Sequence, residues 1–537
     1  MFKNRNVAEI FENIVGKDNF SEDPAIISSY CVMQLCEAFG APLGMKSKNA
    51  FPYLKIGGVI LPRSTEEVQA IVKTCNKYKI TYKAHSTGLW LFFVPTRDES
   101  LIIDLSQMNK ILKIDEKNMY AVIEPFVTGG AILAELLPKG LTCHVIGAGS
   151  QASILASVTA FCGMGHTSIT TSGNPRNCVG EEWVTPDGDV VRWGLVEEGK
   201  VGHPGIGYRG ITRGTFGSGG GLGVFTKCAI KLYPYAGPAK PEITGEGCAV
   251  GWKVPDNVKI HLIGFPTPEK LADFTYKLTE AKIAFLAWTF VTAYYAGKCT
   301  ETNEEMYANL KKYEETGAIK KMNQTITVIT TGVTDSELKY KEKVLQDIMK
   351  ETAGEDVLKY GIMTQFDLER FWLHAVTAYK ACTVFREGNG YMGGGGLQFL
   401  NVDGLVKVGY HGYNKIVRKA VQEGVVSDYG PDVNWVGPEE QRPLGHIEFI
   451  ARTDRWDAEL CKKHGAVAAA ANEYCVKEKL LGTGDHGVMV AMVERATQKH
   501  LGNYFDYKHK IKKALDPNDV GDPMFYIGID QDLKITL

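Results

Sequence analysis

Two short segments in the C-terminal third of the chain carry side chains suited to acid–base or metal chemistry. His446-Ile447-Glu448 lies in a predicted strand, where residues two apart point to the same face. Gly482 to Gly487 follows downstream and adds Asp485 and His486. Imidazole and carboxylate groups together suit Zn, Mn or Fe, and an imidazole can also take a substrate proton. We therefore select His446, Glu448 and His486 as candidate catalytic residues, and His446, Glu448 and Asp485 as candidate metal ligands. A hydrogen-bonded His–Glu pair within a sheet is the structural alternative.

A glycine-rich stretch, residues 147–234, has the composition of a backbone cradle for an anionic ligand. It holds 19 of the 58 glycines in 88 residues, about twice the average density of the chain. Its three motifs are Gly163-Met164-Gly165-His166-Thr167, Gly180 to Gly188, and Thr215 to Val224. Glycine lets backbone N–H groups approach a bulky anion without a Cβ in the way. For any single glycine, a tight turn is the alternative interpretation.

Periodicity and turn signals predict the elements that must position these residues. Pro186-Asp187-Gly188 separates two β-rich runs, which predicts a hairpin, and Val224–Leu232 predicts a strand. Ser64, with Glu67 three residues later, predicts a helix that begins with a capping box. Strand–helix units recur at residues 260–281, 325–351 and 447–479, which predicts an antiparallel sheet with helices on one face.

In their order and residue pattern, the glycine motifs resemble the FAD-binding domain of the vanillyl-alcohol oxidase / p-cresol methylhydroxylase flavoprotein family. The resemblance is nearly continuous from Val59 to Pro234, and Ile511–Val520 resembles the closing motif of the family. It implies an α+β fold: a two-part PCMH-type FAD-binding domain with an inserted α+β substrate or cap domain, an antiparallel sheet plus helices. The FAD-binding domain is implied for residues 1–240, with its core at about 55–238. The cap is implied for residues 241–484, and residues 485–537 are implied to return to the FAD domain.

The resemblance also implies which residues bind FAD. The loop Lys83–Leu89 stands where the family cradles the pyrophosphate, with Lys83, Ala84 and Ser86 in place of an arginine and two glycines. Thr87 occupies the position at which some relatives attach FAD covalently to a histidine, so we expect non-covalent FAD. Arg176 is a candidate to neutralise the pyrophosphate and His166 to face flavin or substrate, with structural or surface roles as the alternative. The implied set is Lys83, Ala84, His85, Ser86, Thr87, Gly88, Gly147, Ser150, Ser153, Gly163, Gly165, His166, Thr167, Asn174, Arg176, Gly223 and Val224.

The activity implied is FAD-dependent oxidation of a small hydroxy acid or alcohol by hydride transfer to flavin. Flavin-linked D-2-hydroxy-acid dehydrogenases, a branch of the superfamily, carry a His-containing strand and a Gly-Glu-His-Gly loop that bind a divalent metal and the substrate carboxylate. His446–Glu448 and Gly484–Gly487 match this pattern in part, with Asp485 in place of Glu. The alternatives are an alkylphenol or benzylic-alcohol oxidase or dehydrogenase without metal, and a flavoprotein subunit that relays electrons. A separate electron-acceptor protein is a further candidate partner.

Composition argues against several other classes of protein. The net charge is −2, so we expect no nucleic-acid partner. No run of about 18 apolar residues occurs, so we expect no membrane span. The twelve cysteines are scattered without a Cys-x-x-Cys pair, which predicts reduced thiols in a cytoplasmic protein. Composition leaves open whether the chain forms a homo-oligomer.

Two segments of the cap are predicted from local composition alone. Residues 388–400 contain Gly393–Gly396 and predict a flexible loop, to which we assign no role. Leu405–Tyr410 predicts a strand, with Tyr410 and His411 packed in the core.

Overall fold

A computed structural model places most of the chain. It describes residues 5–30, 56–88, 95, 97, 99–147, 149–160, 164–194, 211, 218, 220–246, 249–297, 300, 302–379, 390–428, 430–440, 444–453, 457–478 and 502–522. Over these ranges, no helix has both the length and the apolar character needed to cross a membrane.

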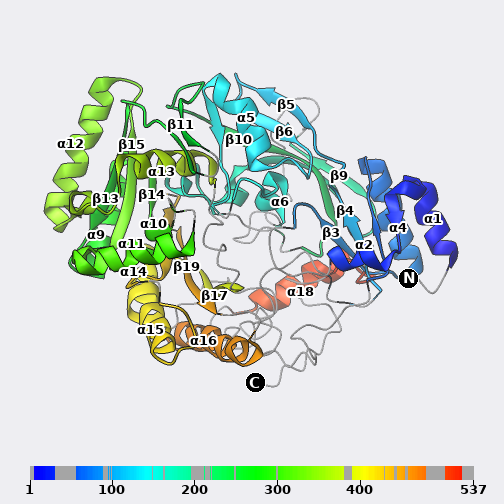
Figure 1. Ribbon diagram of the computed structural model, residues 1–537. Coiled ribbons are helices and arrows are strands. Elements are labelled where there is room, and N and C mark those ends of the chain that lie inside the picture. Colours follow the sequence, from blue (N-terminus) through cyan, green and yellow to red (C-terminus); the bar gives the residue numbers. More distant parts are fainter. Residues whose placement is uncertain are drawn as a thin grey trace.

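The N-terminal part begins with a four-stranded sheet in the order β1-β2-β4-β3, flanked by helices (blue in Figure 1). Its elements are α1 (Arg5–Val15), β1 (Phe20–Ser21), α2 (Pro24–Ser29), β2 (Gly58–Ile60), α4 (Thr65–Tyr78), β3 (Tyr82–His85) and β4 (Leu101–Asp104). The β4 strand pairs in parallel with both β2 and β3, so α4 serves as the crossover between β2 and β3. Ser64 caps α4 as predicted, but the Glu67 carboxylate accepts the N–H of Arg63, so only half of the predicted capping box forms.

A second sheet carries the glycine motifs. It has the order β5-β6-β10-β8-β9, with β7 also paired to β10. The elements of this region are β5 (Ile111–Asp115), β6 (Tyr120–Ile123), α5 (Gly129–Leu136), β7 (Leu141–Cys143), α6 (Ile154–Thr159), α7 (Ser168–Thr171), β8 (Cys178–Val184), β9 (Val190–Trp193) and β10 (Val224–Pro234). The β8–β9 pair confirms the predicted hairpin, with Gly188 in the left-handed region at φ 89°.

The cap that follows is built on two antiparallel sheets, β14-β15-β13-β16 and β17-β19-β18. Backbone hydrogen bonds between Thr289 and Val436 join them, and α9 packs beside α12 (Figure 1). Its main elements are β11 (Ile243–Glu246), β12 (Ala249–Trp252), β13 (Val258–Gly264), α9 (Pro268–Ala281), β14 (Ala284–Trp288), α10 (Thr292–Gly297), α11 (Asn303–Glu315), β15 (Thr325–Thr331), α12 (Asp335–Thr352), β16 (Glu355–Asp356), α13 (Gln365–Thr377), β17 (Gly390–Leu400), α14 (Val402–Val406), α15 (Asn414–Gln422), β18 (Asn434–Glu439), β19 (Leu444–Thr453) and α16 (Ala458–Lys477). The α+β prediction is confirmed.

Two predictions for the cap were wrong. Gly390–Leu400, expected as a loop, forms β17, which pairs with β19 through a register shift between Gly394 and Gln398. Leu405–Tyr410, expected as a strand, belongs to α14 and to a π-helix, Lys407–Tyr413. Tyr410 is buried as expected, but His411 is exposed and its Nε2 lies 2.8 Å from Glu269 Oε1.

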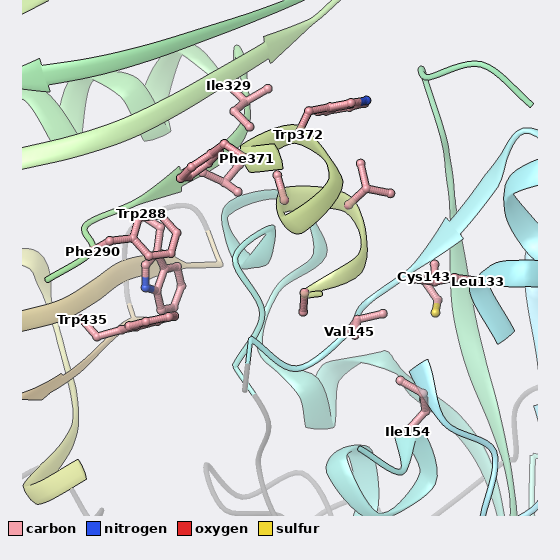
Figure 2. Close-up of a cluster of buried hydrophobic side chains, with 14 of the residues drawn as sticks. Leu133, Cys143, Val145, Ile154, Trp288, Phe290, Ile329, Phe371, Trp372 and Trp435 are labelled. Atoms are coloured by element: carbon pink, nitrogen blue, oxygen red, sulfur yellow. The ribbon is translucent and has the colours of Figure 1, made fainter. Parts of the chain in front are cut away.

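One hydrophobic cluster joins the two parts of the molecule. Figure 2 shows Leu133, Cys143, Val145 and Ile154 from the FAD part near cap residues that include Trp288, Phe290 and Phe371. Because this core is continuous, the cap is positioned against the second sheet by buried apolar contact.

The C-terminal helix α18 (Tyr504–Leu515) lies beside the N-terminal sheet (red in Figure 1). After it, Gly521 forms a parallel bridge with Tyr82 on β3. These contacts agree with the predicted return of the chain to the FAD domain, whose boundaries stay a prediction.

Candidate cofactor and substrate site

A large cavity opens where the N-terminal sheet, α6 and the third glycine motif meet. It contains about 1180 Å³ of empty space, including its open mouth. Eight of the residues that the family resemblance implied for FAD line it: Lys83, Ala84, His85, Ser86, Thr87, Gly88, Ser153 and Gly223. These residues come from the end of β3 with the loop after it, the N-cap of α6, and the turn before β10, so three separate segments converge on one cavity.

The other implied residues lie elsewhere or outside the described ranges. Gly147, Ser150, Gly165 and Val224 lie near the cavity in the chain but do not line it, and His166 and Thr167 line a different cavity. Arg176 Nε lies 2.6 Å from Glu440 Oε1 at the end of β18, so its charge is used in an ion pair with the cap. Asn174 begins a short 3₁₀ helix, and its side chain, like Gly163, lies outside the described part of the structure.

Sequence reasoning missed more than half of the lining. Ser218, Gly220 and Gly221 belong to a glycine motif that the sequence had singled out, so their signal was present. Leu105, Pro125 and Asp522 gave no local signal. The lining residues missed are Tyr82, Leu105, Pro125, Ile146, Ala152, Leu155, Ala156, Ser157, Thr159, Ala160, Ser218, Gly220, Gly221, Phe225 and Asp522.

The cavity fits a large, polar, flat cofactor such as FAD. Ser218 lines it and is 1% exposed, and its Oγ has no hydrogen-bond partner among the described residues. Buried polar groups are nearly always paired, so the unpaired hydroxyl of Ser218, a residue of the cavity wall, indicates that a ligand supplies its partner. Gly223 has φ 89°, and a Cβ there would lie 2.2 Å from the Val184 carbonyl oxygen, so the loop requires glycine at this position.

The charged groups of the cavity are largely balanced. Lys83 Nζ lies 3.0 Å from Asp522 Oδ1, and both side chains are buried. Burial lowers the pKa of His85, an effect that the nearby Asp104 carboxylate opposes. The His85 ring also packs edge-on against Tyr30, whose hydroxyl donates to Asp104. His85 therefore presents a neutral imidazole to the cavity near pH 7.

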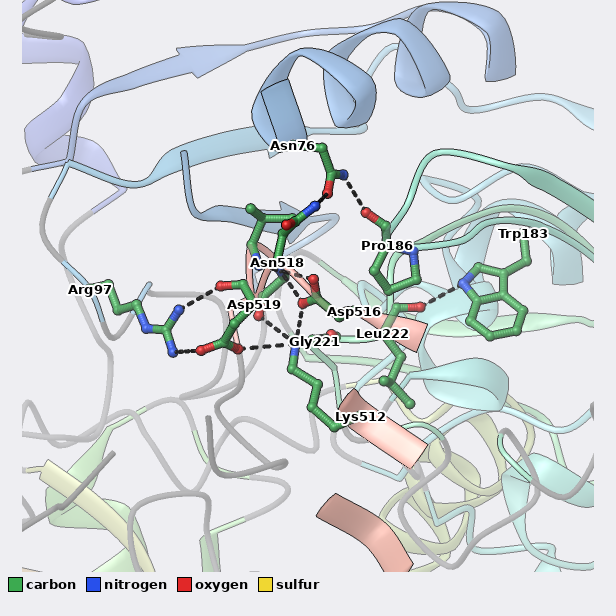
Figure 3. Close-up of polar contacts among 12 residues, drawn as sticks. Asn76, Arg97, Trp183, Pro186, Gly221, Leu222, Lys512, Asp516, Asn518 and Asp519 are labelled. Carbon is green, nitrogen blue, oxygen red and sulfur yellow. Dashed lines mark hydrogen bonds and ion pairs between the residues drawn. The ribbon is translucent and has the colours of Figure 1, made fainter. Parts of the chain in front are cut away.

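Buried hydrogen bonds hold the Gly220–Gly223 wall in place from two sides (Figure 3). On one side, Lys512 Nζ donates to the carbonyl oxygens of Gly221 at 2.7 Å and Gly521 at 2.8 Å, and pairs with Asp516 at 2.5 Å. On the other side, Trp183 Nε1 donates to the Leu222 carbonyl at 2.6 Å. The C-terminal segment therefore helps to shape the cofactor cavity.

The predicted substrate-side residues are only partly described. His446 and Glu448 lie on β19, and His446 Nε2 is 3.8 Å from Glu448 Oε2, which is too long for a hydrogen bond. Asp485 and His486 lie outside the described ranges. Within those ranges, no group of three or more His, Cys, Asp or Glu side chains is placed to hold a metal ion.

An aromatic cluster meets the first glycine motif at the cap. The His166 ring centroid lies 5.1 Å from Phe290, 5.3 Å from Trp435 and 5.7 Å from Trp288. His446 stacks on Trp288 at 6.0 Å. Buried aromatic rings therefore connect the glycine motif that contains His166 to His446, the predicted base.

Comparisons with known proteins agree with this geometry. The FAD binding domain family matches residues 56–194. A probable mitochondrial D-lactate dehydrogenase from Danio rerio is 26% identical over 282 residues, which is 50% of this chain and half of that relative's length. The flavoprotein subunit of 4-cresol dehydrogenase [hydroxylating] from Pseudomonas putida is 25% identical over 506 residues, or 89% of this chain and 91% of the relative.

Among solved structures, p-cresol methylhydroxylase with substrate bound superposes with a TM-score of 0.73 and 17% identity, covering 98% of both chains. The chain therefore carries an FAD-binding domain and has the fold of the vanillyl-alcohol oxidase / p-cresol methylhydroxylase flavoproteins, as its glycine motifs predicted.

Proposed function

We propose that this protein is an FAD-dependent oxidoreductase that oxidises a small organic alcohol or hydroxy acid by hydride transfer to flavin. The cavity carries the proposal, because three segments of the matched fold converge on one space, whose wall includes the unpaired Ser218 hydroxyl. When bound, FAD accepts the hydride, and the protein supplies binding, orientation and a base.

The cofactor would be held largely by backbone and hydroxyl groups. The turn Ser86–Gly88 and the wall Gly220–Gly223 would approach its phosphates and ribose, and Ser218 would supply a hydroxyl donor. The paired Lys83–Asp522 side chains add little net charge. Binding therefore depends on the loop geometry more than on a single cation.

On the substrate side, His446 is the proposed base. Its imidazole would take the hydroxyl proton of the substrate while the carbon-bound hydrogen leaves as hydride. His446 is 2% exposed by side chain, and Glu448 lies close enough to orient or polarise the ring. In the hydroxy-acid version of this proposal, His446, Glu448 and Asp485 would instead hold a Zn, Mn or Fe ion, and His486 would take the substrate proton.

A second candidate is oxidation of an alkylphenol or benzylic alcohol without metal. The buried rings of His166, Trp288, Phe290 and Trp435 favour it, since a flat aromatic substrate could stack among such groups. The nearly full-length likeness to a 4-cresol dehydrogenase flavoprotein subunit supports the same candidate, together with a separate electron-acceptor protein.

Anaerobic bleaching of the flavin absorbance tests the proposal directly. We expect rapid bleaching by one substrate class, with D-lactate and glycolate representing the hydroxy acids and 4-cresol and benzyl alcohol the aromatic class. Loss of hydroxy-acid bleaching after chelation, with recovery on adding Zn, Mn or Fe, would select the metal version. A flavin that dithionite bleaches but no member of a broad panel does would contradict the enzyme proposal and leave the electron-relay alternative.

We expect His446→Gln to lower turnover on the order of 10²-fold, because a general base contributes at least that much. Bound FAD should stay at the wild-type level, since His446 does not line the cofactor cavity. The matched control is His411→Gln, which removes an exposed histidine paired with Glu269. Equal turnover in the two variants would show that His446 has only a structural role.

A further inference from the structure

A second cavity lies between the FAD part and the cap, apart from the cofactor cavity. It contains about 850 Å³ of empty space, including its open mouth. The FAD part contributes β7, α7 and the end of β10, and the cap contributes the start of β14, α12 and the end of α13. No described residue lines both cavities.

The wall of this second cavity has an apolar part and a polar part. Val145, Ile283, Phe285 and Val376 provide an apolar interior, and His166 also lines the cavity. Tyr233 and several threonines line the wall, but the hydroxyls of Tyr233, Thr170 and Thr171 already form hydrogen bonds within the protein. Two lysines, Lys282 and Lys341, add charged donors to the lining.

The charged side chains of the described lining are basic, and none is acidic. Lys282 and Lys341 line the cavity, and none of its described lining residues is Asp or Glu. Lys341 Nζ donates to the Thr331 carbonyl at 2.7 Å and pairs with Glu337 at 2.6 Å, so much of its donor capacity is used. Lys282 is exposed at the C-cap of α9 and forms no ion pair or side-chain hydrogen bond with any part of the chain that the structure describes.

We propose that this cavity binds a small organic monocarboxylate, with the carboxylate at Lys282 and the hydrocarbon body against the apolar interior. An ammonium that has no ion-pair partner among the described residues favours a carboxylate, and Ile283 and Phe285 favour an apolar chain beside it. The site goes beyond the proposed function, because it is separate from the FAD cavity and requires no oxidation of its ligand.

Calorimetric titration of the oxidised, FAD-loaded protein with hexanoate tests the proposal, with hexanol as the uncharged analogue. We expect hexanoate to bind more tightly than hexanol. Lys282→Gln should weaken hexanoate binding at least about tenfold and leave hexanol binding unchanged, because only the charge-assisted contact is lost. Ala284→Leu, which places a larger side chain into the lining, should weaken both ligands.

The matched control is Lys320→Gln, since Lys320 is exposed on the 3₁₀ helix Ala318–Met322 and does not line the cavity. It should bind hexanoate as the wild type does, and every variant should keep its FAD. Absence of measurable hexanoate binding in the wild type would overturn the proposal, as would equal affinity in the wild type and Lys282→Gln. Because no turnover is measured, these results stand apart from the outcome of flavin bleaching.

Discussion

Replacing Gly223 with alanine is expected to lower FAD affinity by at least about 10²-fold, with little flavin left on the purified protein. Left-handed backbone costs a residue with a Cβ about 1–2 kcal/mol. The added Cβ would also lie 2.2 Å from the Val184 carbonyl oxygen and 2.7 Å from Trp183 Nε1. The wall that lines the cofactor cavity must therefore move, and every 1.4 kcal/mol lost is about tenfold in affinity. The ratio of flavin to protein absorbance, followed by FAD titration, measures the effect.

Gly140→Ala is the matched control for this prediction. Gly140 has φ 70°, and a Cβ there would have no atom within 4 Å, so the variant adds backbone strain without a collision. It should retain FAD at the wild-type level. Circular dichroism and the urea midpoint separate cofactor loss from unfolding. A Gly223→Ala protein that keeps full FAD occupancy would place the cofactor away from the Gly220–Gly223 wall.

Local signals account for the elements that the sequence predicted well. Helix α9 spans Pro268–Ala281 as expected, because Thr267 caps its first turn and proline occupies the first helical position. The β8–β9 hairpin was predictable because Asp-Gly in its turn permits the left-handed backbone there. Each of these features is decided by residues a few positions apart.

Elements that depend on distant partners could not be predicted in this way. The β17 strand contains four consecutive glycines, a composition that disfavours strands, and it forms through pairing with β19 about fifty residues later. The segment Leu405–Tyr410 is short and mostly apolar, and such a segment cannot be assigned to a strand or a helix from its pattern alone.

The residues of the candidate site also fall into those that local sequence predicts and those that depend on distant contacts. The segment Lys83–Gly88, which forms the end of β3 and the turn after it, lines the cofactor cavity as the family resemblance implied. Asp522 reaches Lys83 from 439 positions along the chain, and Arg176 pairs with Glu440 on the cap. No spacing rule links such residues, so only the folded chain reveals that Lys83 and Arg176 are already paired.

The buried Lys512 cluster should be a large single contributor to the stability of the cofactor domain. We expect Lys512→Met to lower the free energy of unfolding by about 3–5 kcal/mol, because it leaves the buried Asp516 carboxylate without its ammonium partner. It also removes donors from the carbonyls of Gly221 and Gly521, so FAD affinity should fall as well. Urea unfolding followed by tryptophan fluorescence gives the first quantity, and FAD titration gives the second.

Two variants make this prediction specific. Lys513→Met removes the adjacent exposed lysine and should change the free energy of unfolding by less than about 0.5 kcal/mol. Adding Asp516→Asn to Lys512→Met should recover part of the loss, because the unpaired charge is removed. The recovery should be incomplete, because asparagine keeps only one of the two side-chain oxygens that accept the backbone N–H groups of Val520 and Gly521. If Lys512→Met unfolds at the same urea concentration as Lys513→Met, the ion pair contributes no net stability. If FAD affinity is also unchanged, the C-terminal segment does not shape the Gly220–Gly223 wall.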